Sequence, residues 1–166
     1  MSHPALRAKA EPVQKVNSQV RRIIRDMRET MKAAPGIGLA APQVGVLQQI
    51  IVYDTGEPGC AGALVNPRIV HAEGEAADVE GCLSIPGLQG TVPRAERVIV
   101  RGLDGHGRKV EIDASGLLAR VLQHEIDHLY GILFIDRAIP DTLHWAVREP
   151  EHAQAQTDEA QPAAVA

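Results

Sequence analysis

The chain has 166 residues, which suits a single domain with a sizeable hydrophobic core. Its formal net charge is −4 and its pI is near 6.0, so charge gives no general argument for nucleic-acid binding or for docking on an anionic membrane. It has no apolar run of transmembrane length, no signal-peptide hydrophobic region and only two cysteines, so we expect a cytoplasmic protein without a disulfide framework.

The first predicted element is an amphipathic helix. Residues 1–12 precede it as an extended or irregular lead-in with two prolines. From Asn17, an expected N-cap, apolar side chains recur at helical spacing until Ala34-Pro35-Gly36 ends the helix. These side chains are Val20, Ile23, Ile24, Met27 and Met31. The charged residues between them form a solvated face without a functional signal.

A series of short strands is predicted next. The β signals cover residues 49–53, 63–65, 68–72, 97–103 and 108–112. Asn66-Pro67 is expected to end the second strand, and the sequence Asp104-Gly105-His106-Gly107 indicates a hairpin turn between the last two. A further short closing strand is a candidate at Leu133–Ile135.

A buried helix is predicted over about 114–130, with Asp113 and Ser115 as candidate N-caps and Gly131 after its end. The order of elements predicts an α+β fold: one domain with antiparallel sheets packed around this central helix, plus the N-terminal helix. We expect the domain to span 1–147. The remaining residues, 148–166, form an acidic tail rich in Ala and Gln that is expected to be disordered.

The strongest functional signal is the segment His124-Glu125-Ile126-Asp127-His128. Residues four apart share one face of a helix, so both imidazoles can reach one metal ion. Glu125 is placed about 100° round the helix, where it can act as a base without binding the metal. Because the helix is apolar almost all round, these polar groups are expected to be buried, which is costly unless something pairs them.

A catalytic metal usually has three protein ligands and one open position, so a third ligand is needed. The metallopeptidase pattern HExxHxxGxxH fails at its last position, which is Phe134. Glu149 lies at the distance of another known solution, but it stands at the start of the weakly apolar tail. Cys82 is the better candidate, because a cation stabilises a thiolate, whereas Cys60 is interpreted as a small buried hydrophobe.

A glycine-rich stretch, Gly36-Ile37-Gly38-Leu39-Ala40-Ala41-Pro42-Gln43, follows the first helix. It lacks the spacing of the phosphate-binding fingerprints and does not follow a strand. Its small residues favour close approach of the backbone to another segment or to a ligand, which would hold Gln43 on a rigid segment. Without other signals, Gln43 would be read as a surface amide.

Three segments, GIGLAAPQ (36–43), EGCLS (80–84) and QHEIDH (123–128), together resemble the peptide deformylase family, and the similarity runs from about residue 5 to 145. That family removes the formyl group from the N-terminal methionine of newly made bacterial and organellar polypeptides. The resemblance implies that Cys82, His124 and His128 ligate one divalent metal. It favours Fe(II), with Ni(II), Co(II) or Zn(II) as alternatives, although the ligand types alone would have suggested zinc.

The resemblance also implies roles for other residues. Glu125 is implied as the catalytic base, with the Gln43 side-chain N–H and the Leu83 backbone N–H as donors to the formyl oxygen. Glu80 and Arg94 match a pair that braces the cysteine segment; the alternative is a surface ion pair of little energetic value. The expected walls of a methionine side-chain pocket are Ile37, Gly38, Leu117 and Val121.

Two departures from the family pattern concern binding. Gln89 stands where several relatives have an arginine that helps to position the peptide backbone, so peptide preference is expected to differ. Some relatives dock on the ribosome through a long basic C-terminal helix, and the acidic tail argues against that mode here. The expected partners are N-formyl-methionyl nascent peptides and, transiently, the ribosome; we expect a monomer with no nucleic-acid site and no membrane contact.

Two alternative functions remain open at this point. One is a zincin-type metallopeptidase, which would need a third ligand downstream of the HExxH segment. The other is a non-catalytic paralogue that binds a metal or a peptide, for which neither Glu125 nor an open coordination position would be needed.

Overall fold

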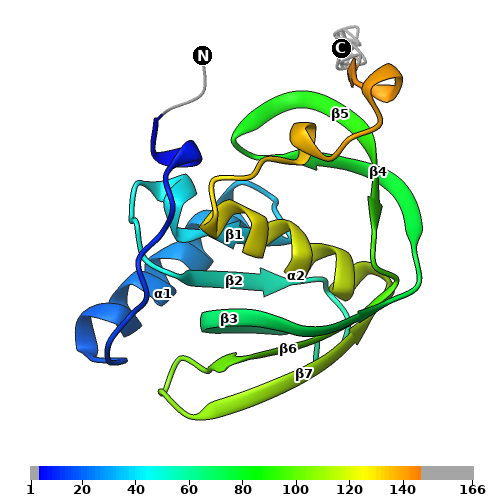
Figure 1. Ribbon diagram of the computed structural model, residues 1–166. Coiled ribbons are helices and arrows are strands. Elements are labelled where there is room, and N and C mark those ends of the chain that lie inside the picture. The colour runs from blue at the N-terminus through cyan, green and yellow to red at the C-terminus, as the bar shows by residue number, and fades with distance from the viewer. Residues whose placement is uncertain (1–3, 147–166) are drawn as a thin grey trace, which may run out of the picture.

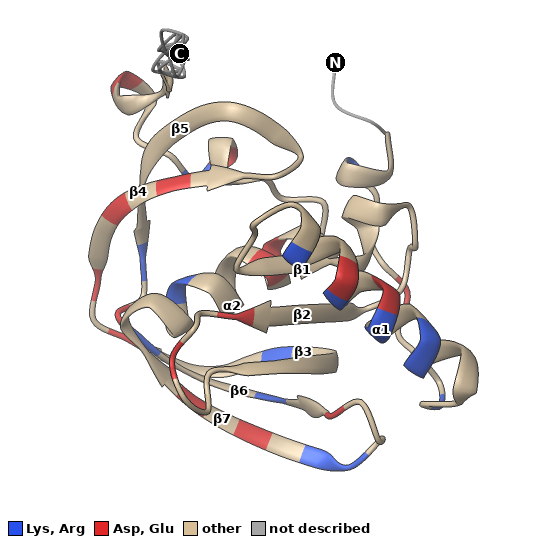
Figure 2. Cartoon of the chain, turned by 180° about the vertical axis from the view of Figure 1, so that it is seen from behind, with Lys and Arg blue, Asp and Glu red and all other residues tan. Residues whose placement is uncertain are grey.

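The structure is a computed structural model that describes residues 4–146. Helix α1 spans Ser18–Ala33, close to its predicted bounds. Asn17 is its N-cap, because the side-chain oxygen accepts a hydrogen bond from the Val20 N–H at 3.0 Å. Figure 2 shows Lys and Arg alternating with Asp and Glu along the exposed side of α1, the mixed charge of a solvated face. The lead-in contains a 3₁₀ helix at Pro4–Arg7.

Five strands form the larger sheet, in the order β1-β2-β3-β6-β7 with every pair antiparallel. They are β1 (Gly38–Ala40), β2 (Ile50–Asp54), β3 (Ala61–Glu73), β6 (Arg97–Leu103) and β7 (Lys109–Ser115). The predicted hairpin turn joins β6 to β7, and the Asp104 side chain accepts hydrogen bonds from the backbone N–H groups of His106 and Arg108 at 2.8 and 3.0 Å.

Each face of the larger sheet packs against one helix. Along β2, Ile51 and Tyr53 belong to a core cluster shared with α2 (Gly116–Leu129), whereas Ile50 and Val52 belong to a cluster shared with α1. This division follows from the alternation of side chains along a strand. Figure 1 shows α2 between the larger sheet and the arch formed by β4 and β5. The layers are therefore α1, the larger sheet, α2 and a smaller sheet.

The smaller sheet has the order β4-β5-β8 and is antiparallel. Its strands are β4 (Ala76–Cys82), β5 (Ile85–Arg94) and β8 (His144–Trp145). A separate core cluster, built on Val92, Phe134 and Ala138, supports it. The expected α+β domain, with antiparallel sheets around a central helix, is thus confirmed, and within residues 4–146 no helix is long and apolar enough to cross a membrane.

Three expectations about individual elements are wrong. The segments 63–65 and 68–72 belong to one strand, β3, which continues through Asn66 with a shift in register. Asn66 adopts a φ of 52°, a conformation that asparagine tolerates, and its side-chain amide makes two 2.8 Å hydrogen bonds with the Val13 backbone. Near Leu133–Ile135 there is a 3₁₀ helix, Phe134–Asp136, because Asp136 accepts a hydrogen bond from the Leu133 N–H. Asp113 lies in β7 instead of capping α2.

Candidate metal centre and active site

Helix α2 presents two histidines and a glutamate at the centre of the protein. His124 and His128 are buried and lie one turn apart, and their Nε2 atoms are 3.3 Å from each other. Burial lowers the pKa of His128 to about 3, which keeps its imidazole neutral and able to donate a lone pair. Burial also opposes protonation of His124, but hydrogen bonds with Cys82 and Glu80 outweigh it and raise its pKa to about 10. A cation at Nε2 would compete with that proton.

Cys82, at the end of β4, completes a group of three donor atoms. Its Sγ lies 3.3 Å from His128 Nε2, and all three donor atoms lie within 4.8 Å of one another. Tetrahedral coordination with ordinary metal–sulfur and metal–nitrogen bond lengths needs donor separations of about 3.3–3.6 Å. The three side chains therefore fit a divalent metal ion.

Glu80 fixes the orientation of the His124 ring. The ring Nδ1 lies 2.9 Å from Glu80 Oε2, and because a carboxylate only accepts, Nδ1 carries the proton and Nε2 faces Cys82 and His128. Burial alone would raise the pKa of Glu80, but hydrogen bonds from Arg94 and His124 outweigh it and lower the pKa to about 2. Glu80 is therefore ionised near neutral pH, and its stabilising contribution is lost only as the pH falls from its unfolded value near 4.5 towards 2.

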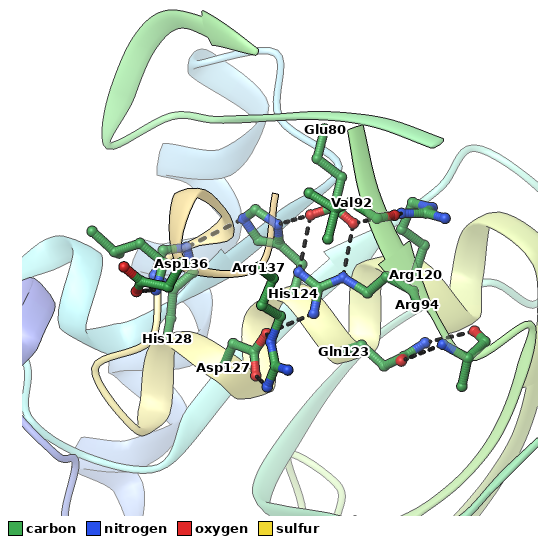
Figure 3. A network of polar contacts seen from close by, with 12 residues as sticks. Glu80, Val92, Arg94, Arg120, Gln123, His124, Asp127, His128, Asp136 and Arg137 are labelled. Carbon is green, nitrogen blue, oxygen red and sulfur yellow. Dashed lines mark hydrogen bonds and ion pairs between the residues drawn. The ribbon is translucent and has the colours of Figure 1, made fainter. Parts of the chain in front are cut away.

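The Glu80–Arg94 pair lies in the interior and not on the surface. Arg94 Nε and Nη2 donate to the two carboxylate oxygens of Glu80 at 2.8 and 2.9 Å, and both side chains are at least 95% buried. Arg94 Nη1 also donates to Asp127 at 2.6 Å, and Asp127 accepts two hydrogen bonds from Arg137. Figure 3 shows this chain of contacts running from His124 through Glu80 and Arg94 to Asp127 and Arg137. The network joins β4 and β5 to α2, which it contacts at His124 and at Asp127.

Glu125 is buried beside the three donor atoms. Its Oε2 has no hydrogen-bond partner among residues 4–146, and burial raises the pKa of the carboxyl to about 7. A carboxyl with such a pKa can both accept and release a proton near neutral pH, which is what a general acid–base catalyst needs. Gly38 leaves room for it, because a Cβ at this position would collide with the Glu125 carboxylate and lie 2.9 Å from Glu125 Cγ.

Replacing Gly38 with alanine is therefore expected to displace the Glu125 carboxylate and to lower the kcat of this site by about 10²-fold, the effect of a misplacement of about 1 Å. The matched control is Gly105→Ala, where the added Cβ would make only an ordinary 3.7 Å contact with Ile24. Catalytic turnover and thermal unfolding would be measured for both variants. Unchanged kcat in a correctly folded Gly38→Ala variant would show that the base does not occupy this position.

Gln43 lies on a short 3₁₀ helix, Ala41–Val44, directly after β1. Its side-chain oxygen accepts a hydrogen bond from the Ala40 N–H at 2.7 Å, so the amide NH₂ points the other way. That NH₂ donates to Ser84 Oγ at 3.1 Å and lies 3.6 Å from Cys82 Sγ. Gln43 is thus a rigidly held donor, as its place on the glycine-rich segment predicts, and it lies beside the three donor atoms.

A cavity of about 580 Å³ opens onto these groups. Every expected pocket residue lines it, namely Ile37, Gly38, Leu117 and Val121, together with Gln43, Leu83, Cys82, His124 and Glu125. Val121 is buried, whereas Ile37, Leu83 and Leu117 are partly exposed at its edge. Phe134, which rules out the commonest metallopeptidase pattern, is buried with its ring stacked at 6.4 Å from that of His124.

Several residues that the sequence analysis assigned no role contribute to this site. They are Ser84, Arg120, Gln123, Asp127 and Arg137. Gln123 makes hydrogen bonds to both the N–H and the carbonyl of Ala95, which ties α2 to the turn before β6. For Arg120, Gln123 and Asp127, the available signal was their place as polar residues on a helix with a strong apolar face, since buried polar groups need partners.

Comparisons with known proteins agree with this geometry. The sequence profile of the polypeptide deformylase family matches residues 1–143. The chain is 54% identical over 141 residues to the peptide deformylase of Thermomicrobium roseum, covering 81% of this chain and 80% of that protein. The crystal structure of a peptide deformylase from Legionella pneumophila matches with a TM-score of 0.78 and 47% identity, covering 82% of this chain and 81% of that one. A peptide deformylase from Synechococcus elongatus, in complex with actinonin, has the same TM-score and identity over 82% of this chain and 74% of its own. The chain therefore belongs to the polypeptide deformylase family, as its three motifs predict.

Proposed function

We propose that this deformylase removes the formyl group from the N-terminal formyl-methionine of nascent polypeptides and releases formate. The observation that carries the proposal is the meeting of three elements in one cavity: a Cys-His-His donor set, a buried glutamate with an unpartnered oxygen, and an oriented amide donor. Membership of the deformylase family supports the same reaction.

Cys82, His124 and His128 would hold one divalent metal ion, Fe(II) in the native enzyme, with Zn(II), Ni(II) or Co(II) as substitutes. A mixed set of sulfur and imidazole ligands suits these borderline cations better than Mg²⁺ or Ca²⁺. When bound, the metal supplies Lewis acidity, which lowers the pKa of a water molecule and polarises a carbonyl group. Glu80 keeps the His124 Nε2 atom directed at the metal position by accepting the Nδ1 hydrogen bond.

Glu125 is the residue that moves the proton in this mechanism. Its Oε2 atom, which has no partner among the described residues, accepts a proton from the attacking water. The same carboxyl then delivers that proton to the methionine nitrogen as the C–N bond of the formamide breaks. The products are formate and a free amino terminus, so one base serves both halves of the reaction.

Negative charge develops on the formyl oxygen during the attack, and two donors of this chain are proposed to stabilise it. One is the Gln43 side-chain N–H, whose orientation is fixed by the hydrogen bond that its oxygen accepts from the Ala40 N–H. The other is the backbone N–H of Leu83, which follows the ligand Cys82. Each such preorganised donor typically contributes about 10²–10³-fold to the rate.

The methionine side chain is proposed to enter the cavity between Ile37 and Gly38 on one side and Leu117 and Val121 on the other. The apolar walls suit an unbranched thioether, which buries its surface without needing a hydrogen-bond partner. The partner is the amino-terminal end of a newly made chain, so we place the enzyme in the cytoplasm, in transient contact with the ribosome and as a monomer.

Formate release from formyl-Met-Ala-Ser by the anaerobically Fe(II)-loaded protein tests the proposal. We expect turnover with Fe(II) and slower turnover with Zn(II). The absence of formate from every metallated form would reject the assignment, whereas cleavage of internal peptide bonds would favour a metallopeptidase.

A further inference from the structure

Arg120 lies in the wall of the active-site cavity, with most of its side chain shielded from solvent. It lies on α2 one turn before His124, on the stripe that also carries Leu117, and its side chain is only 12% exposed. Arg120 lies outside the three deformylase motifs, because it precedes the segment at 123–128. A charged side chain placed this deep on an apolar helix needs partners for its guanidinium group.

The guanidinium group has three partners on two strands. Arg120 Nη1 donates to Glu80 Oε1 at 2.7 Å and to the Val92 carbonyl at 2.9 Å, while Nη2 donates to the Ala76 carbonyl at 2.7 Å. Ala76 and Glu80 belong to β4 and Val92 belongs to β5. One side chain from α2 therefore contacts both strands of the β4–β5 hairpin, and Cys82 lies at the end of β4 where this hairpin turns. The planar fork of an arginine suits this arrangement, because it presents several N–H donors at fixed angles.

Two arginines hold Glu80 from different elements. Arg94, at the end of β5, contacts both carboxylate oxygens, and Arg120 contacts Oε1 from α2. The remaining contact of the carboxylate is with His124 Nδ1, at Oε2 (Figure 3). If Arg120 were missing, Glu80 would be held to α2 only by the His124 ring itself and, through Arg94, by Asp127 near the far end of the helix. The carboxylate could then tilt, and the His124 ring would tilt with it.

We propose that Arg120 is a positioning residue of the deformylation reaction, which fixes Glu80 and, through it, the His124 ring relative to Cys82. The inference rests on the proposed function, since it treats His124 and Cys82 as metal ligands. It differs from a purely structural clamp in one respect. Replacing a residue with a purely structural role would change only the fraction of protein that folds. Replacing a positioning residue also changes the geometry of His124 relative to Cys82 in the folded protein.

The test compares Arg120→Met and Arg120→Lys with the wild type. Methionine keeps the apolar stem that lines the cavity and removes the guanidinium group, so KM for formyl-Met-Ala-Ser should stay within about threefold of wild type. Residues that orient metal ligands through hydrogen bonds typically contribute about 10–100-fold to metal affinity or activity. In Arg120→Met, kcat should therefore fall by about 10–100-fold, and a chelator should remove the metal faster by a similar factor. The visible absorption of the Co(II)-loaded protein should shift. Lysine, which keeps the charge but lacks the fork, should restore only part of each effect.

Arg97→Met is the matched control, because Arg97 bridges Asp113 and Glu73 on the larger sheet, away from the cavity. It should leave kcat, metal loss and the Co(II) spectrum unchanged. Arg120 variants with wild-type metal-loss rates and spectra would overturn the inference, as would equal effects of Arg97→Met. If Arg120→Met does not fold, Arg120→Lys decides through the same two measurements. If the wild type releases no formate, the proposed function fails, while metal loss and spectra still test Arg120.

Discussion

Replacing Glu125 with glutamine is expected to lower kcat for deformylation by about 10²–10⁴-fold, the usual contribution of a positioned general acid–base residue. Glutamine has nearly the same shape, but its amide cannot take the proton from the attacking water or return it to the leaving nitrogen. The bound metal should remain, because Glu125 is not one of the three donors that lie within 4.8 Å of one another. Formate release and metal content per chain are the two measurements.

The stability of the Glu125→Gln variant provides an internal control. Folding raises the pKa of Glu125 to about 7, so its ionisation opposes folding at pH values above the unfolded value near 4.5. In chelator-treated protein at pH 8, the variant should therefore unfold at the same temperature as the wild type or a higher one. Glu111→Gln, at a residue that pairs with Arg101 on the larger sheet, should leave kcat unchanged. A fully active Glu125→Gln variant would favour the non-catalytic or differently catalysed alternatives.

The elements predicted correctly from the sequence are those whose pattern is local. Helix α1 has an N-cap and a continuous apolar stripe, β6 was predicted with its observed bounds, and the Asp104–Gly107 turn places its signal in four consecutive residues. Helix α2 was recognisable because apolar residues recur at helical spacing along it, from Leu117 to Leu129. In each case the residues that determine the structure lie close together in the sequence.

Strands β1, β4 and β5 were not predicted, because their pairing is determined by distant residues. β1 has three small or apolar residues in a glycine-rich stretch and becomes a strand by pairing with Ile51–Tyr53. β4 contains Asp78 and Glu80 and has little apolar alternation, yet it pairs with β5 along most of its length. Such pairing overrides weak local propensity, and the continuation of β3 through Asn66 is a further example.

The same distinction applies to the site. His124, Glu125 and His128 could be related from their spacing on one helix. Cys82 is distant in sequence, so it could be preferred only by weighing it against Phe134 and Glu149, and the resemblance of three separated segments supports that choice. Arg94 comes from β5, whereas Arg120 and Asp127 come from α2. The contacts of Arg94 and Arg120 with Glu80, and of Arg94 with Asp127, therefore exist only in the folded chain. A buried charge network is specified by three-dimensional proximity, and one sequence does not contain that information locally.

Replacing Cys82 with alanine is expected to have the largest effect on metal retention. Among the three donors, the thiolate is the only one that carries a negative charge, and it balances part of the charge of the cation. Loss of the thiolate should lower metal affinity by more than the roughly 10–100-fold that is typical when a hydrogen-bond partner of a ligand is removed. Formate release should become undetectable after dialysis. Metal content after dialysis and kcat with excess Fe(II) would be measured together.

Cys60→Ala is the matched control, because Cys60 is the second free cysteine and does not belong to the donor group. It should retain the metal and the activity of the wild type. A Cys82→Ala variant that still bound the metal tightly would require a third ligand from elsewhere in the chain. If that variant also cleaved internal peptide bonds, the metallopeptidase alternative would replace the proposed ligand set. Because Phe134 occupies the position of the usual downstream ligand, we expect neither result.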